Sequence, residues 1–139
     1  MIYNVAGSVN LNDSQVFHYD GEVDSTNKPL AGYFCKVDSG KLTVGTGATE
    51  DDYLGVTIAS STNLGAIDCN DGEAQEYLVQ GTVFVVLDDG VTVNEGDFVG
   101  IAGDGRANIG ANNKIGIFLG VAGEPNTAGQ NVTLAWIKG

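Results

Sequence analysis

Apolar residues in this chain form short runs that are interrupted by clusters of glycine, aspartate and asparagine. From residue 30 onward the runs are rich in β-branched and aromatic residues, which favour strands. No twelve-residue stretch combines the 3.6-residue period of an amphipathic helix with capping residues, although 63–67 would fit a short turn. The predicted strands are 30–37, 41–44, 53–60, 76–87, 97–102, 115–122 and 131–138.

Turn-forming tripeptides separate most of the predicted strands. They occupy residues 38–40, 70–72, 88–90, 94–96, 103–105 and 128–130. All of them except the last end in glycine and also contain an aspartate or an asparagine. Short strands punctuated in this way are typical of a sandwich or a barrel. The sequence therefore predicts an all-β fold, a compact glycine-rich β-barrel or sandwich.

Two stretches of 19 residues, 38–56 and 103–121, align without a gap. Both end in Leu-Gly-Val, and Lys41 and Val44 have conservative counterparts in Arg106 and Ile109. We interpret the match as a repeated strand–turn–strand unit, near 32–60 and again near 96–123. Two such units would form a pseudo-twofold barrel that hides their edges. A chance match in a chain rich in glycine and valine is the alternative.

Residues 1–29 differ from the remainder of the chain because they are polar and rich in Asn, Asp and Ser. We interpret them as an extended N-terminal arm or edge segment, distinct from a β-barrel domain at 30–139. The alternative is that they supply a first strand of the same barrel. An arm with a few apolar anchors is able to dock on a neighbouring subunit.

Charge narrows the range of partners. The chain has 18 Asp and Glu against six Lys and Arg, a net charge of −12. Nucleic-acid phosphates and anionic membrane surfaces would repel it, so neither is an expected partner. The acidity permits docking on a basic protein surface and is equally consistent with a solvated acidic exterior. The start of the chain lacks the basic and apolar regions of a secretion signal, so we expect synthesis in a cytosol.

The sequence contains no motif that predicts catalysis, a cofactor or a metal. His18 is the single histidine, and neither of the glycine-rich stretches at 45–50 and 103–108 has the third glycine of a phosphate loop. Residues 68–79 miss a calcium loop because the glycine comes one position early and Val79 replaces the closing glutamate. Cys35 and Cys69 are buried small hydrophobes or a disulfide pair. We therefore predict a protein that is not an enzyme, with no cofactor, catalytic residue or metal ligand.

Residues 30–139, about four-fifths of the chain, resemble the small head-decoration (cement) proteins of tailed bacteriophages. The resemblance lies in the strand-forming stretches 54–59, 79–85, 95–100, 115–122 and 132–136. It implies a compact β-barrel, often a homotrimer, which binds the major capsid protein and stabilises the outer surface of the virion by bridging capsid subunits. It also implies synthesis in the host cytoplasm. The motifs are structural, and the resemblance does not extend to residues 1–29.

The arm is the segment that we expect to contact the capsid or a neighbouring subunit. Its candidate contact residues are Val5, Val9, Leu11, Phe17 and Tyr19. The alternative function is a small β binding module, from a phage fibre or an adhesin, that recognises surface carbohydrate. That alternative predicts exposed aromatic side chains near loops.

Overall fold

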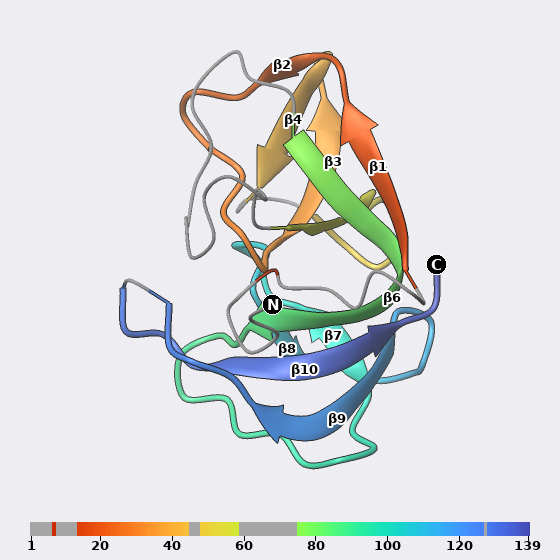
Figure 1. The fold of residues 1–139 in the computed structure, drawn as a ribbon, viewed down its shortest axis with the longest axis vertical. Coiled ribbons are helices and arrows are strands. Elements are labelled where there is room, and N and C mark those ends of the chain that lie inside the picture. The colour runs from red at the N-terminus through yellow and green to blue at the C-terminus, as the bar shows by residue number, and fades with distance from the viewer. Residues whose placement is uncertain (1–6, 8–13, 45–47, 59–74, 127) are drawn as a thin grey trace.

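Strands are the only regular elements in the part of the chain that the structure describes. The structure is a computed structural model, and it describes residues 7, 14–44, 48–58, 75–126 and 128–139. The all-β prediction is thereby confirmed (Figure 1). The strands are β1 (Gln15–Tyr19), β2 (Glu22–Val23), β3 (Phe34–Asp38), β4 (Lys41–Val44), β5 (Gly55–Thr57), β6 (Gln75–Val86), β7 (Val99–Ile101), β8 (Ala107–Ile109), β9 (Gly116–Ala122) and β10 (Val132–Ile137).

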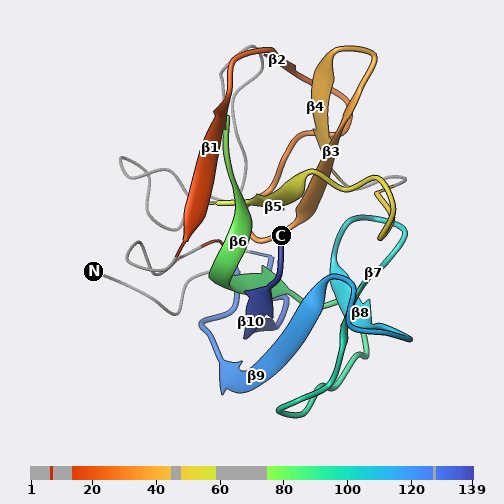
Figure 2. The same cartoon turned by 90° about the vertical axis from the view of Figure 1, so that its right-hand side faces the viewer.

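The twelve-residue strand β6 joins the two halves of the molecule. Its first half pairs antiparallel with β1 and β5, and its second half, from Gly81 to Val86, pairs antiparallel with β10. Between the halves lies Gly81, whose φ of 131° is outside the usual range for residues with a side chain. Figure 2 shows β6 turning at this level from the upper strands to the lower ones.

The main sheet has eight strands and does not close into a barrel. Its order is β2-β4-β3-β5-β6-β10-β9, with β1 added on β6, so the path ends on β2 and β9. β7 and β8 form a separate hairpin, which single bridges connect to β9 (Phe98↔Ile117) and to the residue after β6 (Leu87↔Ala107). Of the two predicted architectures, the sandwich describes the fold.

Two clusters of buried side chains lie on opposite faces of β6. Val83, Val85 and Leu87 belong to the larger cluster, which also contains Phe34 and Phe118 and so fills the space between the two halves. The intervening residues, Phe84 and Val86, belong to the second cluster with Cys35, Leu42 and Val132. Because both faces are buried, this part of the strand is a continuous apolar run without alternation. Each large side chain buried here contributes about 1.5–3 kcal/mol.

The two matched stretches of sequence share their order of strands. In the first, the β3–β4 hairpin has β5 beside β3, with Phe34 opposite Val56. In the second, the β7–β8 hairpin is bridged to β9 from Phe98 to Ile117. The registers of the two units therefore differ. In the first unit Val56 itself is paired, whereas in the second the bridge is at Ile117, four residues before Val121, the counterpart of Val56. The twofold relation between the units stays a prediction.

All seven predicted strands are present, and their ends differ from the predicted ones by up to four residues. β3 ends one residue later and β6 begins one residue earlier than predicted, and the predicted end of 53–60 lies outside the described residues. Within residues 1–29, residues 15–19 pair with β6 as β1, and residues 22–23 pair parallel with β4 as β2. The division of the chain into an N-terminal segment at 1–29 and a domain at 30–139 stays a prediction. The predicted short turn at 63–67, the calcium-like loop with Cys69, and the candidate contact residues Val5, Val9 and Leu11 lie outside the described residues.

The bend at Gly81 generates the first testable prediction. A Cβ atom at this position would lie 2.5 Å from the Ser14 hydroxyl oxygen and 2.9 Å from the Ser14 Cα. Gly81→Ala should therefore lower the free energy of unfolding by about 2–5 kcal/mol, through backbone strain and overpacking together.

Gly90→Ala is the matched control, because Gly90 has a φ of 73° and nothing within 4 Å of the added carbon. That variant should lose only about 1–2 kcal/mol, the strain of a left-handed residue. Urea unfolding measures both values. Equal losses in the two variants would show that the contact with Ser14 does not constrain β6.

Candidate interaction surface

Phe17 and Tyr19, the candidate contact residues that the structure describes, lie on the same face of β1. Phe17 is 50% exposed, and its ring stacks on Tyr77 of β6 with the centroids 6.1 Å apart. Tyr19 is partly buried, and its hydroxyl donates a hydrogen bond of 2.8 Å to the carbonyl oxygen of Gly40 in the β3–β4 turn. The Phe17 ring is therefore held by β6, and the Tyr19 ring is held by the β3–β4 turn.

Sequence reasoning missed two other residues of this surface, Tyr77 and Val37. Tyr77 lies opposite Phe17 on one side and opposite Thr57 of β5 on the other, and it packs against the second core cluster. Val37 follows the buried Cys35 by two residues on β3, so it shares the same face, yet it is 45% exposed. We call Phe17, Tyr19, Val37 and Tyr77 the sheet-end patch.

Carboxylates lie at the same end of the sheet as the patch, at the top of the molecule in Figure 1, where β1 ends and β6 begins. Strand alternation places them on the face opposite to the patch. Asp20 follows Tyr19, Glu76 lies opposite His18, and Asp38 follows Val37. Glu22 of β2 lies opposite Lys41, with its carboxylate 3.9 Å from the lysine Nζ. This end of the sheet therefore carries four carboxylates and one lysine. They are Asp20, Glu22, Asp38, Glu76 and Lys41.

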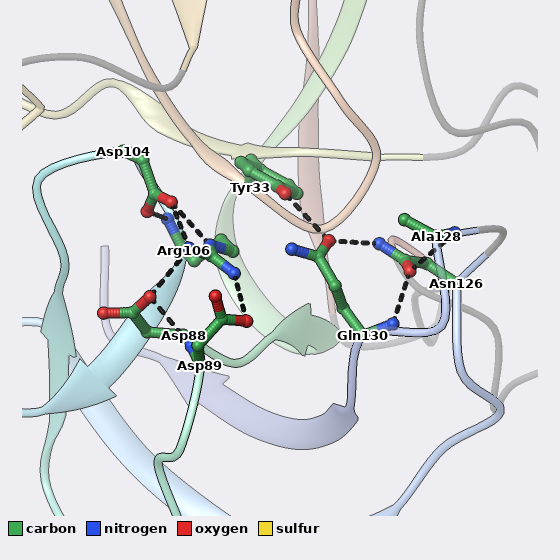
Figure 3. A network of polar contacts seen from close by, with 8 residues as sticks. All are labelled: Tyr33, Asp88, Asp89, Asp104, Arg106, Asn126, Ala128 and Gln130. Atoms are coloured by element: carbon green, nitrogen blue, oxygen red, sulfur yellow. Dashed lines mark hydrogen bonds and ion pairs between the residues drawn. The ribbon is translucent and has the colours of Figure 1, made fainter.

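A second polar feature centres on Arg106, which follows the turn between β7 and β8 (Figure 3). Its guanidinium lies 2.8 Å from Asp88, 3.0 Å from Asp89 and 2.5 Å from Asp104, and the Arg106 side chain is only 11% exposed. The sequence match paired Arg106 with Lys41, but Lys41 is 47% exposed and contacts a single carboxylate. The planar, multidentate guanidinium explains why arginine occupies the crowded position.

These contacts shift the acid–base equilibria of the cluster. Partial burial alone would raise the pKa of Asp104, but hydrogen bonds from the Arg106 side chain and backbone outweigh it and lower that pKa. The pKa of Arg106 is raised, first by its hydrogen bond to Asp104 and then by Asp89. Asp104 and Arg106 are therefore both ionised at neutral pH.

A separate chain of hydrogen bonds lies beside the Arg106 cluster (Figure 3). The Tyr33 hydroxyl donates to the side-chain oxygen of Gln130 at 3.0 Å, and the Asn126 amide donates to the same oxygen at 2.7 Å. The backbone nitrogen of Phe34 also donates to the carbonyl oxygen of Gly105 at 2.8 Å. Together these bonds join the start of β3 to turns of the lower half, so their role is structural.

The described residues offer little for nucleophilic or metal chemistry. Cys35 is a buried, free cysteine, and burial raises the pKa of its thiol to about 11, so it stays protonated near neutral pH. His18 is exposed, with its Nε2 3.9 Å from Asp20. No group of three or more His, Cys, Asp or Glu that could hold a metal ion is found in this part of the chain. Nor does this part contain a helix long and apolar enough to cross a membrane.

A shallow groove of about 240 Å³ lies between the segment after Leu87 and the ends of β9 and β10. Its wall mixes aliphatic side chains and glycines with two threonines and an asparagine, and it contains no aromatic side chain. The lining residues are Leu87, Val91, Thr92, Val93, Gly120, Ala122, Gly123, Asn131, Val132 and Thr133.

Comparison with known proteins identifies the fold. Neither a protein-family model nor a curated protein sequence matches this chain. A chain in a solved structure described as the capsid of Myoviridae phage XM1 matches with a TM-score of 0.67. The match covers 99% of this chain and 92% of that one, at 18% sequence identity. At that identity the likeness establishes a shared fold.

The Arg106 cluster generates the second prediction. Because the pKa of Asp104 is lower in the folded than in the unfolded chain, its ionised form stabilises the fold above the unfolded pKa of about 3.9. That stabilisation is lost as the pH falls through the folded value. Asp104→Asn should therefore flatten the decline of the free energy of unfolding on acidification from about pH 6 to 2.

Denaturant unfolding at each pH measures this effect, with Glu95→Gln, at an exposed position away from the cluster, as the control. A decline for Asp104→Asn as steep as that of the wild type would contradict the prediction.

Proposed function

We propose that this protein is a structural virion protein that decorates the outer surface of a tailed-phage capsid and stabilises it by bridging capsid subunits. The observation that carries the proposal is the shared fold with a chain of a phage capsid structure over nearly the whole length of both chains.

The charge of the chain supports a position on the outside of the shell. A net charge of −12 would be repelled by packaged nucleic acid, whose phosphates attract basic proteins. A subunit that binds across two capsid subunits stabilises the assembled state over the separated one, by an amount that grows with its occupancy. Many copies on one shell add their effects, so modest affinity for each site suffices.

Two details of the proposal concern assembly. The protein would act as a homotrimer bound to the major capsid protein, and its contacts would include the N-terminal residues Val5, Val9 and Leu11 with Phe17 and Tyr19. The exposure of Phe17 supports its part in this contact.

The carbohydrate-binding alternative has less support. The groove beside β9 has no aromatic side chain in its lining, whereas small-ligand sites combine aromatic side chains with placed polar groups. Among the described residues, the large aromatic side chains that are exposed are Phe17 and Phe98. Phe17 lies on a strand with Tyr77 beneath it, a position better suited to a protein contact.

Co-purification with virions tests the proposal. We expect mass spectrometry of purified particles to detect the chain in many copies per particle, at a constant ratio to the major capsid protein. Heads that lack it should rupture at lower temperature than complete heads. A soluble monomer that is absent from particles would overturn the proposal.

Truncation tests the contribution of the N-terminal segment. Deleting residues 2–20 would remove β1 and confound binding with folding, because β1 pairs with β6 throughout its length. Deleting 2–13 retains Ser14 and β1 and should weaken binding to heads while the protein stays folded. Serine at positions 5, 9 and 11 is the full-length control and should have the same effect. Unchanged affinity in both variants would remove these residues from the contact.

A further inference from the structure

We propose that the sheet-end patch, with the four carboxylates at the same end of the sheet, forms the docking surface for a basic protein surface with an apolar pocket. This inference rests on the proposed function, which makes the partner a capsid subunit. The central residue is Phe17, which is 50% exposed, and Val37 of the patch is 45% exposed.

Phe17 is positioned for insertion before any partner binds. Its ring stacks on Tyr77 at an interplanar angle of 29°, and Tyr77 in turn packs against the second core cluster. Tyr19 is fixed by its hydrogen bond to the Gly40 carbonyl oxygen. A half-exposed aromatic ring on a rigid support loses little conformational entropy on binding, which is a property of interface anchors.

The patch also continues the buried core without interruption. On the same face, Cys35 and Leu42 are fully buried, while Val37, two residues after Cys35 on β3, is 45% exposed. Val37 lies directly opposite Leu42. A covering partner would complete the burial of this face, as expected where an apolar cluster opens onto the surface of a binding protein.

Charge decides between the possible occupants. The chain has a net charge of −12, and four carboxylates lie at this end of the sheet, where Asp20 is almost fully exposed, as is much of Glu22. A second copy of this chain, docked patch to patch, would bring two acidic sheet ends close together, and like-charge juxtaposition is unfavourable. A partner with lysine or arginine around an apolar pocket complements both features.

The test measures binding to heads purified from a phage strain that lacks this gene, by co-sedimentation over a range of NaCl concentrations. Phe17→Ser should weaken binding about tenfold or more, as expected for an aromatic anchor. The double variant Asp20→Asn/Glu76→Gln should bind more weakly at low salt and depend less on salt, because it removes screened charge contacts.

Matched controls come from the opposite half of the molecule and from other carboxylates. Ile109→Ser removes an apolar side chain that is 52% exposed on β8, and Asp51→Asn/Glu95→Gln removes two exposed carboxylates. Both should retain the wild-type affinity within about twofold. Val37→Lys is a second patch variant at an exposed position, and it should weaken binding even if Phe17→Ser unfolds.

The possible results separate this inference from the proposed function. If the wild type fails to bind the heads, the proposed function itself is overturned. If the wild type binds and the patch variants bind as well as the controls do, only the docking surface is wrong. If sedimentation shows that Phe17→Ser or Val37→Lys dissociates an oligomer of the free protein, a second copy occupies the patch and the inference is also overturned.

Discussion

The passage of one strand, β6, through both halves of the molecule is the constraint on which the rest of the structure depends. Its first half pairs with β1 and β5, its second half with β10, and the change of direction falls at Gly81, where Ser14 leaves no room for a side chain. Because the strand turns there, residues of the upper and lower strands share one apolar cluster. The alternate side chains of its second half fill the other cluster. Loss of the bend at Gly81 would move the upper strands away from the lower ones and disrupt both apolar clusters.

The same arrangement explains which parts of the fold the sequence predicts. The dense runs of Val, Phe and Ile, such as 83–87, identify strands because burial on both faces excludes polar residues there. β1 and β2 are harder to predict, since their polar residues face solvent and their pairing partners lie far along the chain. The role of Arg106 was also hidden. Its three aspartates come from two turns that each resemble ordinary loop sequence, and only the fold brings them together.

The candidate surface was predictable in part, for a related reason. Phe17 and Tyr19 stand out as apolar residues in a polar segment. Val37 and Tyr77 do not, because a valine or tyrosine within a strand is the expected core residue. Their exposure depends on how β1, β3 and β6 end together beside the β3–β4 turn, which is a property of the tertiary structure. The resulting surface combines an exposed aromatic side chain with carboxylates at the same end of the sheet. The fold that carries it is shared with a chain of a phage capsid structure.

Electron cryo-microscopy of the intact virion tests this account most directly. It predicts density for the domain on the outer face of the shell, across a boundary between capsid subunits, with the end of the sheet that carries Phe17 against a basic surface of the capsid. Density inside the shell, or a bound domain whose Phe17 end points to solvent, would contradict it.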